Sequence, residues 1–430
     1  MMKAKVITLG CKVNQYESEA MLSSLLQHGF AAAEDKETAD VVILNSCTVT
    51  AESDRKVRQI FRRAKKDNPD AVMVLTGCMA QAFPEDARRL EEADIILGTS
   101  NRKRLVPDLL AFLSARQRII DIAPHTNDEK FENLNVENFT GRTRAFVKIE
   151  DGCNRFCSYC IIPYARGRVR SKPLEDLKAE LAGLGANGYK EVVLTGINLS
   201  AYGQEFGLHL CDAIEAACAT PGIERVRLGS LEPEQLSEDV IRRMAKQKKL
   251  CPQFHLSLQS GCDATLKRMN RHYTADEYRT IVRNLRAAFE NAAITTDIMV
   301  GFAGETDEEF AESLAFAEEI AFAKVHVFAY SRRPGTRAYD MGDQLTNAVK
   351  EARSHEMIRM TTATQQAFFK AQIGRTEEVL FEREIQKGVW EGYSMNYTPV
   401  AVASGTSLAG EIRSVRIESC TDTHCMGAVL

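Results

Sequence analysis

Three cysteines in one short segment have the spacing of metal ligands. The segment EDGCNRFCSYC places Cys153, Cys157 and Cys160 in a C-x3-C-x2-C pattern. A structural zinc site needs four ligands, and no fourth cysteine or histidine stands near in sequence, so an iron–sulfur cubane with one open iron fits better. The open iron can bind a substrate or cofactor. A disulfide cluster or three filler thiols are the alternatives, and the strand-like AFVKIE and Asp-Gly turn before the triplet disfavour them.

A second cysteine triplet is spread over the first 80 residues. The apolar runs KVITLG, DVVILNS and AVMVLTG have the length of buried strands, and each precedes a stretch with helical periodicity. This alternation predicts a parallel sheet with crossover helices. Cys11, Cys47 and Cys78 directly follow the three runs. Because parallel strands end at one shared edge of the sheet, we expect these cysteines to converge on a second metal site. A strand-end cysteine is otherwise a small buried hydrophobe.

Two predicted helices of this region carry further signals, a capping pattern and a basic face. Asn14 and Glu17 have capping-box spacing at the start of the helix after Cys11, which is expected to end at Gly29. In the helix after Cys47, basic side chains surround an apolar stripe from residue 55 to residue 66. This basic face is either a solvated surface or a contact for nucleic-acid phosphates.

The composition sets the outer limits. The chain has 430 residues, 44% hydrophobic and 27% charged, with a net charge of −4, so a nucleic-acid partner must be met by local basic patches. No apolar run approaches the roughly 20 residues that cross a bilayer, and no signal core follows the first methionine, so we expect a cytoplasmic protein without a membrane partner. Twelve cysteines in that compartment favour metal binding or packing over disulfides.

The rest of the chain predicts two further units. After a polar, acidic linker, six strand candidates alternate with helices up to about residue 335, which fits an open (βα)6 partial barrel. From about residue 371, short strands separated by Gly and Ser turns predict a small β-barrel. The fold class is therefore α/β. The predicted domains are residues 1–120, a linker at 121–140, the partial barrel at 141–370 and the small barrel at 371–430.

The first triplet, with Tyr159 just before its last cysteine, resembles the signature of the radical S-adenosylmethionine (SAM) superfamily. That resemblance implies a 4Fe-4S cluster that reductively cleaves SAM to a 5′-deoxyadenosyl radical. It also implies SAM-binding roles at Tyr159 and at loop positions after the strands, namely Gly196, Asn198, Ser230, Glu232 and Gln259. Ordinary turn and capping chemistry is the alternative for each of these loop residues.

The small barrel contains EGYSMNYTPV, which resembles the strand signature of the TRAM domain, an RNA-binding barrel. Its net charge is negative, so RNA binding there would use Tyr393, Asn396 and Tyr397, or a restricted arginine face, rather than bulk charge. A second candidate RNA contact follows the first triplet, where basic residues alternate at Arg166, Arg168, Arg170 and Lys172.

The order of these units resembles the methylthiotransferase family, which implies two 4Fe-4S clusters, SAM, a tRNA anticodon stem-loop as substrate and a reductase or flavodoxin-type electron donor. The opening LGCKVNQYES is most similar to the branch that acts on C2 of N6-threonylcarbamoyladenosine. The carboxylate of the threonylcarbamoyl group is expected to bind arginines after the last barrel strand, namely Arg332, Arg333 and Arg337. Methylthiolation of isopentenyladenosine or of a ribosomal protein, and a non-catalytic iron–sulfur RNA-binding protein, remain alternatives.

Overall fold

The computed structural model describes residues 1–34, 37–134, 136, 139 and 142–430. Residues 135, 137–138 and 140 of the predicted linker lie outside the described residues. No described helix is both long and apolar enough to cross a membrane.

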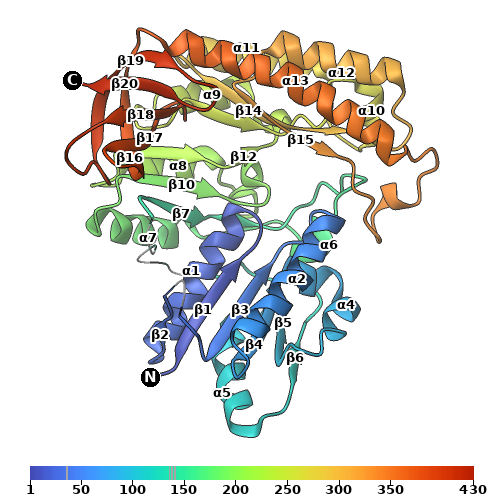
Figure 1. Cartoon of the computed structure of the whole chain (residues 1–430). Coiled ribbons are helices and arrows are strands. Elements are labelled where there is room, and N and C mark those ends of the chain that lie inside the picture. Colours follow the sequence, from blue (N-terminus) through green and yellow to red (C-terminus); the bar gives the residue numbers. More distant parts are fainter. Residues whose placement is uncertain (35–36, 135, 137–138, 140–141) are drawn as a thin grey trace.

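The N-terminal region is a six-stranded parallel sheet in the order β2-β1-β3-β4-β5-β6. Alternate residues of each strand face opposite sides, and both sides are covered. Helices α2, α3 and α4 pack against Val42 and Leu44, whereas α1 and α5 pack against Val41 and Ile43. The predicted strand–helix alternation is thus confirmed (Figure 1). The strands are β1 (Lys3–Thr8), β2 (Ala31–Ala32), β3 (Val41–Ser46), β4 (Val72–Gly77), β5 (Ile95–Leu97) and β6 (Ile119–Asp121). The helices are α1 (Lys12–Gln27), α2 (Ala51–Asp67), α3 (Cys78–Ala82), α4 (Pro84–Arg88) and α5 (Leu105–Ala115).

The central region is an open partial barrel made of two parallel sheets. One sheet has the order β11-β10-β7 and the other β12-β13-β14-β15, and within the described chain no pairing joins β7 to β15. Six successive βα units therefore form an arc, as the sequence predicted. The strands are β7 (Arg144–Lys148), β10 (Glu191–Thr195), β11 (Arg225–Leu228), β12 (Ser230–Leu231), β13 (Gln253–Leu256), β14 (Ala293–Val300) and β15 (Lys324–Ala329), and β8 (Glu150–Asp151) pairs with β9 (Arg170–Ser171).

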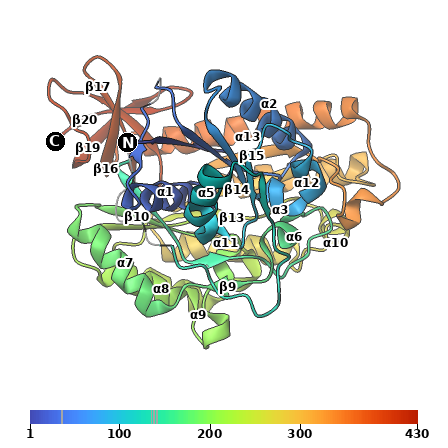
Figure 2. The same cartoon turned by 90° about the horizontal axis from the view of Figure 1, so that it is seen from below.

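Helices enclose the outside of this arc, where α7, α8 and α9 follow one another along one side (Figure 2). Their apolar faces and the strands share one core, which includes Leu181, Ile214 and Val282. Capping boxes at Thr274 and Thr306 start α11 and α12. The helices are α6 (Ile162–Arg166), α7 (Leu174–Ala186), α8 (Leu210–Ala219), α9 (Glu238–Ala245), α10 (Asp263–Arg268), α11 (Ala275–Ala288), α12 (Asp307–Ile320) and α13 (Asn347–Gln372).

The C-terminal region is a closed five-stranded barrel in the order β16-β17-β18-β20-β19, which confirms the predicted small barrel. It has its own apolar core, built from residues such as Val379, Val402 and Ile417. The long α13 leads into it along the outside of the partial barrel (Figure 1). The strands are β16 (Thr376–Gln386), β17 (Val389–Ser394), β18 (Pro399–Ala403), β19 (Ile412–Cys420) and β20 (Cys425–Val429).

Candidate active site between two cysteine triplets

The N-terminal triplet gathers where β1, β3 and β4 end. Cys11 is exposed, Cys47 is half-buried and Cys78 is buried. Burial, together with the neighbouring thiols of Cys78 and Cys11, raises the pKa of Cys47 to about 12. The structure therefore brings together three cysteines that are far apart in sequence, as expected for a shared ligand set.

Two glycines make this convergence possible. Gly10 has φ +115°, and a Cβ there would lie 2.9 Å from Cys47 Cβ. Gly77 has φ +95°, and a Cβ there would lie 2.4 Å from the Ser46 carbonyl oxygen. Both positions favour glycine for conformation and for space. Each glycine directly precedes a cysteine of the triplet, so the chain can turn sharply at the sheet edge.

The second triplet forms a loop beside the partial barrel. The Cys160 amide donates to the Cys157 carbonyl at 2.9 Å, and the Cys153 Sγ accepts from the Arg155 amide at 3.5 Å. Burial, together with the neighbouring Cys157 thiol, raises the pKa of Cys153 to about 12. The protein alone would keep the Cys153 thiol protonated, whereas iron displaces thiol protons on binding.

This donor set fits an iron–sulfur cluster at each triplet. Among the described residues, no three His, Cys, Asp or Glu side chains are placed to hold a single metal ion. In a four-iron cluster each cysteine binds a different iron, so the thiols need not meet at one point. The ligand assignments, Cys11, Cys47 and Cys78 for one cluster and Cys153, Cys157 and Cys160 for the other, stay predictions.

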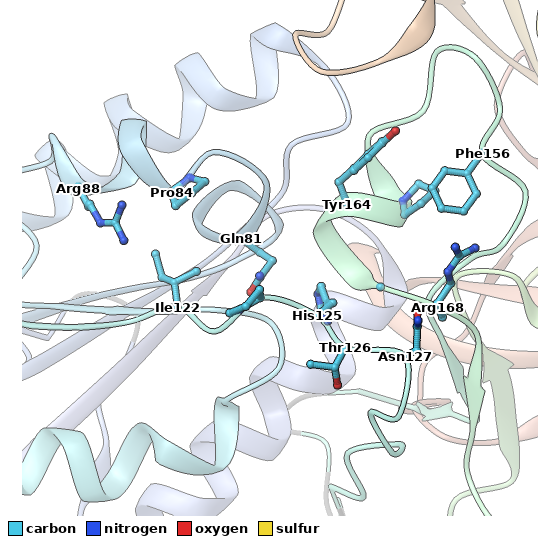
Figure 3. A pocket seen from close by; sticks show the side chains of 13 residues that line it. Gln81, Pro84, Arg88, Ile122, His125, Thr126, Asn127, Phe156, Tyr164 and Arg168 are labelled. Atoms are coloured by element: carbon cyan, nitrogen blue, oxygen red, sulfur yellow. The ribbon is translucent and has the colours of Figure 1, made fainter.

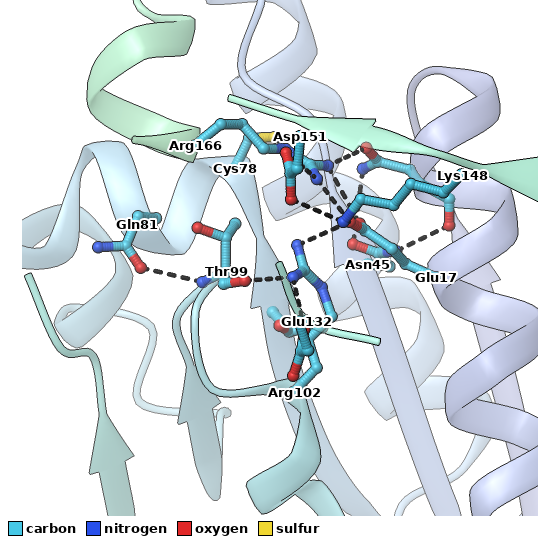
Figure 4. A network of polar contacts seen from close by, with 12 residues as sticks. Glu17, Asn45, Cys78, Gln81, Thr99, Arg102, Glu132, Lys148, Asp151 and Arg166 are labelled. Carbon is cyan, nitrogen blue, oxygen red and sulfur yellow. Dashed lines mark hydrogen bonds and ion pairs between the residues drawn. The ribbon is translucent and has the colours of Figure 1, made fainter. Parts of the chain in front are cut away.

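A buried network of ion pairs and hydrogen bonds surrounds Glu17 and reaches Cys78 of the N-terminal triplet (Figure 4). Arg166, six residues after Cys160, donates from Nε to Cys78 Sγ at 3.3 Å and from Nη1 to Glu17 at 2.5 Å. Lys148 contacts Glu17 at 2.8 Å and Asp151 at 2.6 Å. The network thus ties the loop of one triplet to a ligand of the other.

In this network, two buried carboxylates, Glu17 and Asp151, are each surrounded by several cations. Burial alone would raise the pKa of Glu17, but Arg102, Arg166 and Lys148 together lower it to about 2. The pKa of Asp151 is held well below its usual range by Lys148 and Arg166 against the same burial effect. Both carboxylates are therefore ionised at neutral pH.

Two sequence predictions about these residues are wrong. Glu17 does not cap α1: Cys11 is the N-cap without a side-chain hydrogen bond, and Asn14 donates instead to the Leu9 and Ser46 carbonyls. Arg166, Arg170 and Lys172 do not face RNA, because they are buried and pair with the carboxylates Glu17, Asp151 and Glu180. Among the four basic residues of that segment, only Arg168 is exposed.

Several predicted SAM-binding residues lie near the second triplet. Glu232 forms an ion pair with Arg271 at 2.5 Å, and Arg271 donates to Cys157 Sγ at 3.4 Å. Tyr159 meets Phe302 edge-on with ring centroids 6.3 Å apart. Arg271 was missed in the sequence, because nothing in the segment MNRHY marks it as a cluster neighbour.

The other predicted SAM contacts lie at the strand ends. The Asn198 amide donates to Glu150 at 2.7 Å, and burial holds the pKa of Glu150 well above its usual value. Gly196 packs against that carboxyl, since a Cβ there would lie 2.6 Å from Glu150 Oε2. The buried atoms Asn198 Oδ1 and Glu150 Oε1 have no partner among the described residues, so they are available to a polar ligand. Ser230 is exposed, and Gln259 has φ +69°.

The tyrosines of the C-terminal barrel face the partial barrel instead of a free surface. Tyr393 and Tyr397 stack with centroids 4.6 Å apart, and the Arg144 guanidinium lies 5.1 Å from each ring. Asn396 is buried, and it donates to the Asn291 carbonyl at 3.2 Å. The prediction that these three residues bind RNA is therefore wrong, because they form a contact between two units of the chain.

Arg333 is also unavailable to a substrate. It is buried and donates to Asp54 and to Thr48 at 2.7 Å each, so the prediction that it binds a substrate carboxylate is wrong. Arg332 and Arg337 are exposed, and Arg332 lies over the Tyr339 ring at 4.3 Å.

A pocket of ≈ 470 Å³ opens beside the second triplet (Figure 3). Phe156, between Cys153 and Cys157, reaches it with φ +49° and 36% exposure. The Arg168 guanidinium lies 4.8 Å from the Phe156 ring centroid, and Tyr164 meets that ring edge-on at 5.9 Å. The cysteine loop therefore reaches the surface at an aromatic and basic patch formed by Phe156, Tyr164 and Arg168.

Comparisons with known proteins agree with this arrangement. Residues 3–98 match the "Uncharacterized protein family UPF0004", and residues 147–317 match the radical SAM superfamily. The chain is 36% identical to the threonylcarbamoyladenosine tRNA methylthiotransferase MtaB of Bacillus subtilis (strain 168), over 95% of this chain and 92% of the relative. It is 35% identical to the tRNA-2-methylthio-N(6)-dimethylallyladenosine synthase of Pelotomaculum thermopropionicum, over 99% and 97%.

The fold has a counterpart among solved structures. The radical SAM methyltransferase TsrM from Kitasatospora setae, with cobalamin and a [4Fe-4S] cluster bound, aligns with a TM-score of 0.57 at 15% identity, over 78% of this chain and 74% of that one. At that identity the likeness concerns the fold alone.

Proposed function

Because this chain belongs to the tRNA methylthiotransferase family, we propose that it adds a methylthio group to C2 of N6-threonylcarbamoyladenosine beside the tRNA anticodon. The observation that carries this proposal is the pairing of two cysteine triplets across one buried network, where Arg166 joins the second triplet to Cys78. The relatives' substrates include both threonylcarbamoyl and dimethylallyl adenosine. The opening segment LGCKVNQYES favours the first of these substrates.

The six cysteines would form two cluster sites with different chemical roles. Cys11, Cys47 and Cys78 would hold one 4Fe-4S cluster, and Cys153, Cys157 and Cys160 the other. When bound, the second cluster with SAM supplies a radical, and the N-terminal cluster supplies the sulfur. An aromatic C–H bond is too strong for side-chain acid–base chemistry, so the protein's part is to position the base and exclude water.

Around the second cluster, the polar groups at the strand ends would orient SAM. Asn198 Oδ1 and Glu150 Oε1, which have no hydrogen-bond partner in the described part of the chain, and the loop residues Gly196, Ser230 and Gln259 offer polar contacts. Glu232 is linked to Cys157 by Arg271, which contacts both. Tyr159 adds an aromatic wall. Burial raises the pKa of Glu150 well above its usual value, which favours the protonated carboxyl, a form that donates as well as accepts a hydrogen bond.

The partners follow from the same site. An anticodon stem-loop would dock beside the two triplets, with exposed Arg62 and Lys66 and half-buried Arg58 of α2 as phosphate contacts. A flavodoxin-type or reductase donor would approach at Phe156 and Arg168, since this is where the cysteine loop reaches the surface. A tRNA substrate also fits the predicted cytoplasmic location.

The test offers reconstituted enzyme two tRNAs, one with threonylcarbamoyl and one with isopentenyl on the adenosine, and reads the nucleoside masses. We expect a methylthio mass gain on the threonylcarbamoyl substrate. A gain on the isopentenyl tRNA alone, or on a ribosomal protein while neither tRNA changes, would refute the proposal. Replacing Cys11, Cys47 and Cys78 by alanine should abolish the gain while SAM cleavage to 5′-deoxyadenosine continues, which separates the enzyme from a non-catalytic RNA-binding protein.

A further inference from the structure

The last strand of the partial barrel is buried on one face and open on the other. Val325 and Val327 of β15 pack against the main core. Lys324, His326 and Phe328, which alternate with them, are exposed. Phe328 is 47% exposed, although a large aromatic ring on a sheet usually packs against a neighbour. We call the side that carries Lys324, His326 and Phe328 the β15 face.

The neighbouring strands continue this face with polar side chains. In the β14–β15 register, Asp297 lies opposite His326 and Thr295 lies opposite Lys324. His255 of β13 contacts Asp297 at 3.4 Å and Thr295 at 3.1 Å. Asp297 is therefore engaged by a histidine. No hydrogen bond or ion pair of Lys324 is found in the described part of the chain.

Neighbouring residues relate the β15 face to both cysteine triplets. Just beyond its end, Tyr330 packs on Phe302 at 5.0 Å, and Phe302 meets Tyr159 of the second triplet at 6.3 Å. Lys12, the residue after Cys11, lies close enough to His326 to influence its pKa. An adenine held on this face would therefore lie near both cluster sites.

We propose that the β15 face holds the target adenine, with Phe328 against the base and Lys324 recognising the carboxylate of its N6 substituent. This inference rests on the proposed function and specifies how the site selects an anionic substituent. The β15 face takes the role predicted for Arg332, Arg333 and Arg337, of which Arg333 is already held by Asp54. Lys324 has no such carboxylate partner in the described chain.

The spacing along the strand suits this substrate. Phe328 lies four positions after Lys324, which places their Cα atoms about 13 Å apart on the same face. In adenine, C2 and C6 lie on either side of N1. The bonds that leave the ring at C2 and C6 diverge. The N6 substituent therefore extends away from the cysteines beyond Tyr330 when C2 points toward them. A threonylcarbamoyl group on N6 extends toward the start of β15, where the long Lys324 side chain can meet its carboxylate.

The experiment compares two anticodon stem-loop RNAs, one with threonylcarbamoyladenosine and one in which the carboxylate is replaced by a primary amide. Wild-type enzyme should favour the carboxylate RNA in both kcat/KM and binding. Lys324→Ala should reduce this preference by about 10- to 100-fold, the usual range for a hydrogen bond to a charged group, and Lys324→Arg should keep most of it. Lys248→Ala, an exposed lysine before β13, is the matched control and should keep the full preference.

Phe328→Leu provides a second, independent readout. It removes the ring but keeps an apolar side chain, so it should weaken binding of both RNAs by about tenfold or more and leave their ratio unchanged. Iron content and SAM cleavage report on folding in every variant. Equal preference in Lys324→Ala and wild type would overturn the inference, as would a wild-type enzyme that binds both RNAs equally.

The proposed function is read separately, from the product mass formed by wild-type enzyme. A methylthio gain on the carboxylate RNA with an unchanged preference in Lys324→Ala refutes only the role of the β15 face. Absence of any gain refutes the proposed function, while the binding ratio still decides whether Lys324 recognises the carboxylate.

Discussion

Arg166 donates a hydrogen bond from Nε to Cys78 Sγ at 3.3 Å, which joins the segment after one triplet to a predicted ligand of the other. Arg166 follows the second triplet in sequence, whereas Cys78 ends the N-terminal one. Both side chains are buried. A guanidinium next to a cluster thiolate stabilises the reduced, more negative state, so it raises the reduction potential of that cluster.

Arg166→Lys keeps a cation near Glu17 but removes the Nε–H donor. We expect the potential of the N-terminal cluster to fall by about 60 mV, which corresponds to losing about 1.4 kcal/mol of a charge-assisted hydrogen bond in a one-electron couple. A redox titration followed by electron paramagnetic resonance measures the shift. Arg271→Lys, next to Cys157, is the counterpart and should shift only the second cluster. Equal shifts at both clusters in either variant would contradict this reasoning.

The Glu17 network should make the stability of the protein sensitive to acid. The pKa of Glu17 is lowered from 4.5 to about 2 in the folded chain, so its ionised form stabilises the fold above pH 4.5. That contribution, on the order of 3 kcal/mol, is lost as the pH falls from 4.5 toward 2. Glu17→Gln should lower Tm by several degrees at pH 7 and flatten the dependence of Tm on pH in this window.

The matched control for this prediction is Glu85→Gln. Glu85 pairs with Arg88 on the surface, with a side chain that is 73% exposed, so its loss should change the free energy of unfolding by less than about 1 kcal/mol. Similar Tm values for Glu17→Gln and Glu85→Gln would show that the buried network does not stabilise the fold.

Sequence patterns predicted the architecture because apolar periodicity records which faces are buried. Alternating strands and helices predicted the parallel sheets of the N-terminal region and of the partial barrel. Cys11, Cys47 and Cys78 could be placed together because parallel strands end at one edge. The charged residues were harder to assign. Arg166 and Arg333 read as surface cations, and their burial became visible only with the partners Glu17 and Asp54, which lie far away in sequence.

The Tyr393 and Tyr397 pair shows the same limit. An aromatic pair in a small barrel is typical of an RNA surface, yet here Arg144 of the partial barrel covers it. The sequence of one unit carries no signal for the neighbour that packs on it. The role of the β15 face could not be predicted either. Lys324, His326 and Phe328 alternate with valines, but this alternation does not show what meets their exposed side.

The donor proposal predicts a defect that depends on the reductant. Arg168 is exposed beside Phe156, and flavodoxin-type partners would meet it through acidic surfaces. Arg168→Glu should slow SAM cleavage driven by reduced flavodoxin by about tenfold and leave cleavage driven by dithionite unchanged. Arg242→Glu, on α9, is the control. A loss with both reductants would indicate damage to the cluster instead of impaired docking.

The basic face of α2 is predicted to bind tRNA phosphates. Val57, Phe61 and Ala64 are buried against the sheet, and Arg62 and Lys66 are exposed on the opposite side. Arg62 contacts Glu92 at 3.2 Å with 65% of its side chain exposed, and a surface pair of this kind costs less than about 1 kcal/mol to break. These cations are therefore available for an RNA backbone.

Changing Arg58, Arg62 and Lys66 to glutamine should weaken tRNA binding and flatten its salt dependence. Each lost phosphate contact removes about 0.7 to 0.9 from the slope of log K against log salt concentration, so three contacts remove about 2 to 3. Filter binding at several salt concentrations measures the slope, and SAM cleavage should stay at the wild-type rate. A triple variant that binds more weakly with an unchanged slope would mean that α2 acts through folding and not through phosphate contacts.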